Sequence, residues 1–232
     1  MKLGRRTVNA VRYVLEDLLP PAVRDSPLFL PVMYLAWGRD APRFINFRDR
    51  LRTMSEEEYA GFYAKIIPIH GDCDLNRGCV DRILAEVDGG SVLDAGCGRG
   101  RLARLVADAE PARTVVGADL APPSGEAPPN LSFVEGWMGR LPFTDKSFDT
   151  VLCTHTLEHI LDIDEAVADL RRIARRRLIL VVPREREARY PLNLHVHFFP
   201  YAHSFLNRIR APDGRFACEV IQGDIYYRED MA

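Results

Sequence analysis

A glycine-rich turn carries the strongest chemical signal in this sequence. Residues 92–100 read VLDAGCGRG, so an apolar run leads directly into Gly96, Gly98 and Gly100. Glycine lets the backbone turn tightly and lets a ligand approach the main chain closely. A helical pattern follows, and the first turn of a helix offers unpaired N–H groups to a carboxylate or phosphate. The segment therefore predicts a ligand-binding turn between a strand and a helix.

A carboxylate follows the next predicted strand, at Asp119, 19 residues after Gly100. At the tip of a parallel strand, such a carboxylate can accept hydrogen bonds from both hydroxyls of a ribose. An aspartate at a strand end can also be an ordinary turn or cap residue. Because the glycine-rich turn is expected on the neighbouring strand, we interpret Asp119 as a ribose ligand.

The spacing of the glycines separates two classes of nucleotide site. Dinucleotide-binding proteins use G-x-G-x-x-G, whereas here the third glycine comes one position earlier and Arg101 follows it. The G-x-G-x-G spacing, with Asp94 two residues before the first glycine, resembles motif I of class I S-adenosylmethionine (SAM)-dependent methyltransferases. The resemblance implies SAM as the cofactor.

Four further motifs occur in the order of a small-molecule methyltransferase family. They are FVEG at 133–136, LPF at 141–143, FDTV at 148–151 and LEHI at 157–160. The family reads F-V-x-G-D, L-P-F, F-D-x-V and L-E-H, and the resemblance covers residues 91–184. It implies a cofactor site made of Asp94, Gly96, Cys97, Gly98, Gly100, Asp119, Leu120, Trp137, Met138 and Thr154.

The chain departs from this family at Trp137, where relatives usually have an aspartate that contacts the adenine amino group. Trp137 or Met138 can instead stack on or flank the adenine while a backbone amide reads its edge. The alternative is that Trp137 is a partly buried core aromatic.

Two histidines follow the fourth predicted strand, at positions where they could contact the reacting groups. His155 lies at the carboxyl edge of the sheet, where open α/β sheets bind ligands, and His159 would share one face of a helical turn with it. A histidine can act as a base near neutral pH, and methyl transfer needs one only if the acceptor keeps its proton. We expect His155, and second His159, to be catalytic; the alternative for His159 is a structural hydrogen bond.

A second histidine pair, His195 and His197, alternates in an extended segment, so both rings are expected to point the same way. No clear carboxylate or cysteine set completes four ligands, so we expect no metal there. Residues 181–186 and 194–201 are similar to bacterial methyltransferases in which this stretch borders the acceptor site. We therefore expect His195 and His197 to line the acceptor pocket. Tyr63 is predicted there too, without specific support, and further candidates on the same footing are Tyr59, His70 and His203.

The elements that would position these residues begin near residue 88, where short β-branched runs alternate with helical patterns. We expect strands at 91–95, 114–118, 132–135, 148–153 and 177–182, with helices at 101–109 and 163–176. Arg172, Arg175 and Arg176 would occupy the last turn of the second helix as a solvated cluster. Beyond them we expect a helix at 201–209 and a hairpin of strands 216–221 and 225–228 around Gly223-Asp224. Four prolines in 121–130 exclude a regular helix there.

The segment 1–87 reads as helices and loops, with helices expected at 7–19, 55–67 and 75–87. Ser55 and Glu58 form a capping box at the start of the second helix. The apolar run 28–37 could form a lid over the acceptor site. It could instead rest on a membrane surface or bind a second subunit, or pack against the core. We favour a lid that also packs on the core.

Composition narrows the class of protein. The 232 residues are 47% hydrophobic and carry a net charge of −2, which favours a folded domain and argues against a nucleic-acid partner held by phosphate contacts. Five cysteines without a C-x-x-C pair indicate a reducing compartment, so we expect a cytoplasmic protein. We recognise no signal peptide or membrane-spanning run.

Together these features predict an α/β, Rossmann-like three-layer sandwich. Its seven-stranded sheet would be mostly parallel with an antiparallel last strand. A helical extension or lid (1–87) would precede a SAM-binding domain (88–232). The predicted function is transfer of a methyl group from SAM to a hydroxyl, amine or carboxyl of a small-molecule, sugar or lipid-linked acceptor. The alternatives are a non-catalytic SAM-binding partner protein and an NAD-dependent oxidoreductase.

Overall fold

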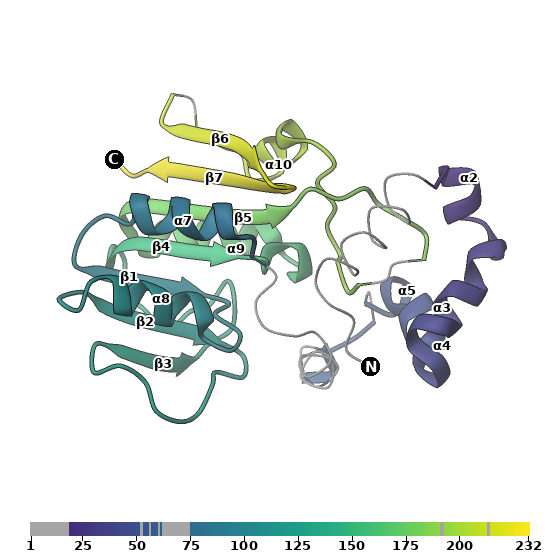
Figure 1. The fold of residues 1–232 in the computed structure, drawn as a ribbon, viewed down its shortest axis with the longest axis horizontal. Coiled ribbons are helices and arrows are strands. Elements are labelled where there is room, and N and C mark those ends of the chain that lie inside the picture. The colour runs from purple at the N-terminus through teal and green to yellow at the C-terminus, as the bar shows by residue number, and fades with distance from the viewer. Residues whose placement is uncertain are drawn as a thin grey trace.

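One seven-stranded sheet organises the computed structural model, which describes residues 19–51, 53–55, 57–59, 61, 75–190, 193–212 and 214–232. Figure 1 shows its order, β3-β2-β1-β4-β5-β7-β6. The strand bounds are β1 Ser91–Ala95, β2 Thr114–Asp119, β3 Leu131–Glu135, β4 Phe148–Thr154, β5 Ala174–Pro183, β6 Phe216–Ile221 and β7 Asp224–Asp230.

The predicted mixed sheet is confirmed. Strands β3, β2, β1, β4 and β5 pair in parallel, and β7 pairs antiparallel with both β5 and β6. The hairpin turns at Gln222-Gly223, one residue before the predicted dipeptide, and both residues have positive φ (49° and 98°). Two positive φ values at the centre of a two-residue loop match the twist of the flanking strands. Because β1 lies between β2 and β4, its carboxyl end lies at the topological switch point of the sheet.

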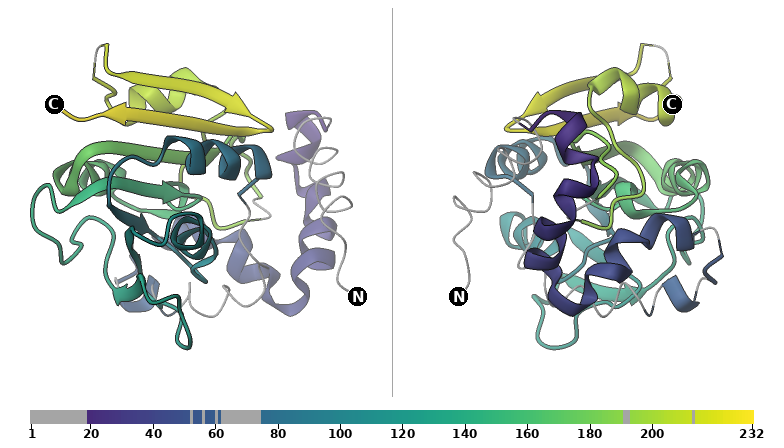
Figure 2. Two further views of the ribbon diagram at one scale, coloured as in Figure 1. Left: turned by 60° about the vertical axis from the view of Figure 1, so that its left-hand side comes forward. Right: turned by 90° about the vertical axis from the view of Figure 1, so that its right-hand side faces the viewer.

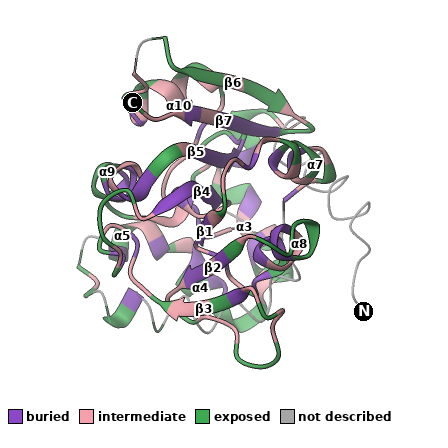
Figure 3. Cartoon of the chain, turned by 90° about the vertical axis from the view of Figure 1, so that its left-hand side faces the viewer, coloured by how far each residue is buried: buried purple, intermediate pink, exposed green. Residues whose placement is uncertain are grey.

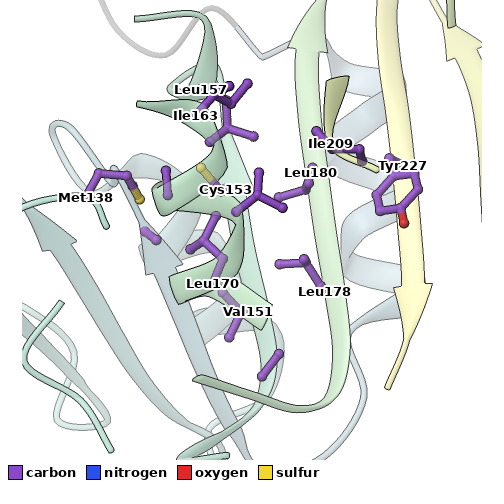
Figure 4. Packing of buried hydrophobic residues seen from close by; sticks show 14 of the residues in the cluster. Met138, Val151, Cys153, Leu157, Ile163, Leu170, Leu178, Leu180, Ile209 and Tyr227 are labelled. Carbon is purple, nitrogen blue, oxygen red and sulfur yellow. The ribbon is translucent and has the colours of Figure 1, made fainter. Parts of the chain in front are cut away.

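Helices cover both faces of the sheet and complete three layers (Figure 3). The amphipathic helices α7 (Arg77–Glu86) and α8 (Arg101–Ala109) pack on one face, against Val92 and Leu152. On the other face, α9 (Ile163–Ile173) and α10 (Ala202–Arg208) pack against the alternate strand residues, such as Leu93 and Leu178. Figure 4 shows part of this second cluster around Cys153 and Leu170. The residues of β4 are buried throughout, as expected for a central parallel strand.

Helix α9 is shorter than predicted, and this corrects the interpretation of the arginine cluster. The helix ends at Ile173, and Arg175 and Arg176 belong to β5. Arg175 donates two hydrogen bonds to the buried carboxylate of Asp149, at 2.8 and 2.5 Å, and Arg176 lies 2.9 Å from Asp88. Both arginines therefore lie in a strand that begins at Ala174, directly after α9, with no loop between the two elements. Arg175 and Arg176 therefore connect the amino end of β5 to Asp149 and Asp88, and they do not cap a helix.

The connection between β2 and β3 contains no helix, as the prolines of 121–130 predicted. The Arg104 guanidinium of α8 partly covers this edge, 5.5 Å from the centre of the Phe133 ring. Arg104 also donates to the backbone oxygen of Glu126 at 2.8 Å. A side chain therefore ties the loop to the neighbouring helix in place of a packed crossover helix.

The N-terminal part lies against the loop that follows β5, beyond the carboxyl edge of the sheet (Figures 1 and 2). Arg24 donates to the backbone oxygen of Tyr190 at 2.5 Å, and Asp25 accepts from Arg189 N at 2.7 Å. Buried aromatic and aliphatic side chains, among them Phe29 and Phe47, join the two segments. The elements here are α2 Pro21–Arg24, η2 Pro27–Phe29, α3 Leu30–Trp37, η3 Gly38–Asp40, α4 Ala41–Ile45 and α5 Phe47–Leu51.

Two of the predicted N-terminal helices lie partly outside the described residues. Helix 7–19 lies almost entirely outside them, but the capping box of helix 55–67 is present. Ser55 N donates to Glu58 at 2.9 Å and Glu58 N donates to Ser55 Oγ at 3.1 Å. In the run 28–37, Leu28 and Leu35 are 78% and 88% exposed, so only part of it packs on the core. None of the helices in the described ranges has the length and apolar character needed to span a bilayer.

Candidate active site

Backbone hydrogen bonds fix the glycine turn between β1 and α8. The N–H groups of Gly96 and Cys97 both donate to the backbone oxygen of Ala118, at 2.7 and 3.0 Å. Gly96 has φ of 76°, and a Cβ there would lie 2.3 Å from Thr156 Oγ1. At Gly100 (φ 73°) a Cβ would lie 2.4 Å from the Phe133 ring. The turn therefore requires glycine both for its dihedral angles and for close packing.

Gly98 differs from its two neighbours. Its φ is 53°, but a Cβ there would meet no atom within 4 Å, so this face of the turn borders open space. Its N–H donates to Asp119 Oδ2 at 2.8 Å, and Asp119 Oδ1 accepts from Ala121 N at 3.1 Å. The carboxylate at the end of β2 thus braces the turn that follows β1.

A cavity opens beside this brace, at the carboxyl ends of the central strands. It holds about 870 Å³ of space outside protein atoms, including some that is open to solvent. Its walls come from the turn after β1, the ends of β2 and β3, the segment after β4 and the start of α9. The lining residues are Tyr59, Gly96, Ala118, Asp119, Leu120, Gly136, Trp137, Met138, Leu141, Thr156, His159, Ile160, Leu161, Asp162 and Glu165.

The structure brings some of the predicted site residues to this cavity and places others around it. Those that line it are Gly96, Asp119, Leu120, Trp137, Met138 and His159. Those that do not line it are Asp94, Cys97, Gly98, Gly100, Thr154, His155, His195 and His197. Tyr63 and His70 lie outside the described residues. His203 is exposed and stacks on Tyr201, with ring centres 5.2 Å apart.

Three of the non-lining residues, Asp94, Cys97 and Thr154, are buried. Asp94 is 1% exposed, and its burial raises the pKa of its carboxyl to about 7, with the nearby Asp119 carboxylate adding to the rise. A hydrogen bond from the backbone of Ala103, in α8, opposes this rise. Burial also raises the pKa of the Cys97 thiol. Thr154 is buried, and its backbone oxygen accepts from Thr156 Oγ1 at 3.0 Å.

Trp137 and Met138 form the wall beyond β3. Met138 is also part of the core beneath α9 (Figure 4), whereas Trp137 is half-buried and packs against the apolar cluster of the N-terminal part. The Arg140 guanidinium lies 5.8 Å from the centre of the Trp137 indole. Trp137 is therefore both a cavity wall and a packing residue, and its contact with adenine stays a prediction.

The structure does not bring His155 to the cavity. Its backbone is left-handed (φ 48°), and its N–H donates to the backbone oxygen of Val181 at 2.9 Å. Its Nε2 lies 3.1 Å from Asp224 Oδ2 in β7, and its Nδ1 lies 3.6 Å from Glu158 Oε1. The ring connects the end of β4 to β7 and to Glu158, so its contacts are with the scaffold.

His159 does reach the cavity, at the end of the short helix η4 (Leu157–His159). Its Nδ1 donates to the backbone oxygen of Leu194 at 3.2 Å, which leaves Nε2 unprotonated in the neutral ring. Its own backbone oxygen accepts a hydrogen bond from the Tyr59 hydroxyl. Tyr59, a weak candidate in the sequence, therefore both lines the cavity and holds the backbone of His159.

Sequence reasoning missed Glu158. Its side chain is 1% exposed, and neither carboxylate oxygen has a hydrogen-bond partner among the described residues. Burial raises its pKa, while His155 and His195 oppose the rise. One ligand atom each from Glu158, His159 and His195 lies within 4.8 Å of the others, and we call these residues the Glu-His-His cluster. The L-E-H motif was a signal for it, but the third member comes from a distant segment.

His195 and His197, predicted as a pair, make different contacts in the structure. His195 is buried, and its ring packs edge-on to that of His159, with centres 4.8 Å apart. His197 Nε2 instead donates to the backbone oxygen of Ile160 at 2.9 Å, and burial lowers the pKa of its ring. The segment that carries both forms no strand. The pair therefore supplies one member of the cluster and one structural hydrogen bond.

Comparison with known sequences finds a matching family model and a curated relative. A family model described as a methyltransferase domain matches residues 93–182. A demethylmenaquinone methyltransferase of Thermus thermophilus is 30% identical in an alignment of 117 positions that covers 47% of this chain and 53% of that protein. The chain thus spans about half the length of the curated relative that it matches.

Solved structures show the same fold. A SAM-dependent methyltransferase from Aquifex aeolicus has a TM-score of 0.54 at 14% identity, covering 73% of this chain and 98% of that one. A putative methyltransferase complex with the Trm112 activator from Haloferax volcanii has a TM-score of 0.53 at 15% identity (76% and 99%). The [4+2]-cyclase SpnF has a TM-score of 0.55 at 20% identity (72% and 74%). At these identities the likeness is one of fold.

Proposed function

We propose that this chain, whose residues 93–182 are a class I SAM-dependent methyltransferase domain, transfers a methyl group to a small or carrier-linked acceptor. The observation that carries the proposal is the brace between Asp119 and Gly98 at the rim of the cavity. This hydrogen bond joins the two parts of the proposed nucleoside site, the glycine turn and the carboxylate at the end of β2. Gly98 and Asp119 are 21 residues apart in the sequence.

The residues around the cavity fit SAM. Asp119 has carboxylate oxygens for ribose hydroxyls, and the open face of Gly98 gives a ligand access to the main chain. Trp137 and Met138 would flank the adenine, with Leu120 beside them. The other predicted cofactor residues would stabilise the turn without lining the cavity. They are Asp94, Cys97, Gly100 and Thr154. Bound SAM supplies an electrophilic methyl group on a sulfonium.

The acceptor would enter on the side of Tyr59, His159 and Ile160. These residues can orient the acceptor and exclude water, and such positioning contributes several kcal/mol, on the order of 7–11 in the best model reactions. His159 can hold a proton at Nε2, because its Nδ1 donates to Leu194. We assign His159, and not His155, to the reacting groups because only His159 lines the cavity.

The N-terminal residues 1–87 would form an extension and lid on the catalytic domain 88–232. Tyr59 supports this division because it reaches the cavity from the extension and donates to His159. Tyr63, His195 and His197 stay predictions for the acceptor pocket; His195 would act through its contact with His159.

The acceptor class is a hydroxyl, amine or carboxyl on a metabolite, sugar or lipid. The name of the curated relative specifies demethylmenaquinone, a reason to include lipid-linked quinols among the acceptors tested. Exposed Leu28 and Leu35 on the extension would suit a lipid-linked acceptor.

The net charge of −2 favours a small acceptor over nucleic acid. The described cysteines are free thiols, in keeping with the proposed cytoplasmic location.

Isothermal titration with SAM, followed by an acceptor screen, tests the proposal. We expect one SAM to bind per chain, and S-adenosylhomocysteine to form when an acceptor gains a methyl group. Absence of binding up to about 1 mM SAM, a binding energy near 4 kcal/mol, would refute a SAM site. SAM binding without turnover across the screen would favour the non-catalytic partner protein. Binding of NAD instead would favour the oxidoreductase.

A further inference from the structure

We infer that the Glu-His-His cluster binds one divalent transition-metal ion, which holds an acceptor oxygen at the wall of the cavity. The metal site itself stands on its own geometry. The role of the ion toward the acceptor rests on the proposed methyltransferase function.

The three side chains have the donor types and spacing of a metal site. One ligand atom from each of Glu158, His159 and His195 lies within 4.8 Å of the others, and His159 Nε2 is 3.9 Å from Glu158 Oε1. Two atoms that ligate one zinc ion, each about 2.0–2.2 Å from it, are about 3–4 Å apart. Small side-chain rotations therefore suffice to bring all three atoms onto one ion.

Hydrogen bonds orient both imidazole rings as metal-binding histidines are usually oriented. His195 Nδ1 donates to Glu185 Oε2 at 2.6 Å, and His159 Nδ1 donates to the backbone oxygen of Leu194 at 3.2 Å. Glu185 is held in turn by Asn193 Nδ2, at 2.8 and 3.1 Å. A ligating histidine typically donates its other N–H to a carboxylate or carbonyl in this way, which fixes the ring and the tautomer.

Glu158 supplies a second observation that points to a cation ligand. The residue is 0% exposed, and within the described part of the chain neither carboxylate oxygen has a hydrogen-bond partner. Buried carboxylates are normally paired, hydrogen-bonded or bound to metal, because an isolated buried charge is costly. The backbone oxygen of Glu158 accepts from Val196 N and His197 N at 2.7 and 3.0 Å, so the segment carrying His195 is fastened beside it.

The donor set indicates the kind of ion and its use. Two imidazoles and one carboxylate suit zinc, iron or cobalt better than magnesium or calcium, and three protein ligands leave a position for another molecule. Because His159 lines the cavity, that position would be accessible to an acceptor hydroxyl. With the ion bound, His159 Nε2 is a ligand and no longer holds a proton; the ion instead would lower the pKa of the hydroxyl, whose proton leaves to solvent. The oxygen then forms a bond to the methyl carbon while the carbon–sulfur bond breaks and its electron pair stays on sulfur.

Cobalt(II) is a suitable probe, because its visible absorption reports coordination. The full chain, stripped with a chelator, is titrated with CoCl2 in the absence of SAM, by absorption and by calorimetry. We expect one equivalent to bind, displaceable by ZnCl2. His195→Ala and Glu158→Gln should each weaken binding at least 100-fold, and Glu185→Gln about 10–100-fold through ring orientation. His203→Ala, an exposed histidine outside the cluster, is the matched control and should bind like the wild type.

Circular dichroism and thermal melting of each variant establish that it folds. If His195→Ala does not fold, the wild-type and Glu185→Gln titrations still decide the matter. Absence of cobalt and zinc binding by the wild type up to about 100 µM, a binding energy near 5.5 kcal/mol, would overturn the metal site. Binding that Glu158→Gln and Glu185→Gln leave unchanged would also overturn it. Metal binding without SAM binding would refute the proposed function alone, and SAM binding without metal would refute this inference alone.

Discussion

The carboxylate of Asp119 accepts a hydrogen bond from the backbone N–H of Gly98 at 2.8 Å, which ties the tip of β2 to the turn after β1. Because the same carboxylate also faces the cavity, it belongs to both the scaffold and the proposed ribose site. Its removal should therefore affect ligand binding more than the loss of a surface carboxylate does.

Asp119→Ala should weaken SAM binding at least about 10-fold, because even one lost hydrogen bond to a charged group contributes about 1.5–3 kcal/mol. Asp119→Asn keeps one acceptor oxygen and should lose less. Isothermal titration measures both, with Asp108→Asn, an exposed aspartate of α8, as the control. Equal affinities for Asp119→Ala and the control would remove Asp119 from the ligand site.

Three glycine substitutions separate steric clash from dihedral strain. Gly96→Ala combines φ of 76° with a Cβ 2.3 Å from Thr156 Oγ1, and should lower the free energy of unfolding by about 2–4 kcal/mol. Gly98→Ala has the strain (φ 53°) without the clash and should cost about 1–2 kcal/mol. Gly90→Ala has neither and should be nearly neutral. Urea denaturation gives the order, and a Gly98→Ala variant less stable than Gly96→Ala would contradict the packing against Thr156.

The buried carboxyl of Asp94 should make stability depend on pH. Burial raises its pKa from 3.8 to about 7, so folding favours the protonated form. Its stabilising contribution is full below pH 4 and is lost as pH rises toward 7, by up to about 4 kcal/mol. Asp94→Asn cannot ionise, so its free energy of unfolding, relative to the wild type, should rise between pH 4 and 7 and then level off. Denaturation of both proteins without ligand measures this difference, and a difference independent of pH would contradict the raised pKa.

Tyr59→Phe should loosen the contact between the extension and the active site. The hydroxyl donates to the backbone oxygen of His159, and removing this hydrogen bond to a partly buried acceptor should cost about 0.5–1.5 kcal/mol. We expect a lower melting temperature and faster amide hydrogen exchange in residues 157–161, with SAM affinity little changed. Tyr34→Phe, an exposed tyrosine of α3, is the control. Unchanged exchange in Tyr59→Phe would show that the hydroxyl does not hold this segment.

The local sequence pattern was sufficient to predict the strand and the helix on either side of the glycine turn. The bounds of β1 and α8 agree with prediction, because an apolar run, three glycines and an amphipathic repeat mark them without help from distant residues. The predicted α9–β5 boundary was wrong because an arginine is compatible with both a helix end and a strand, and the pairing of Arg175 with Asp149 in β4 is a distant contact that the local sequence does not show. Glu158 and His195 are 37 residues apart, and packing of the loop after β5 brings them together. Such a contact between irregular segments has no periodic signature.

The proline-rich connection after Asp119 has a consequence for ligand affinity. Pro122 and Pro123 restrict their own backbone and that of Ala121, whose N–H already donates to Asp119 Oδ1 at 3.1 Å. A chain with few alternative conformations loses little entropy when a ligand settles against it. The segment that follows Asp119 and Leu120 at the edge of the cavity is thus preorganised. A ligand that binds there would lose little affinity to the entropic cost of ordering a loop.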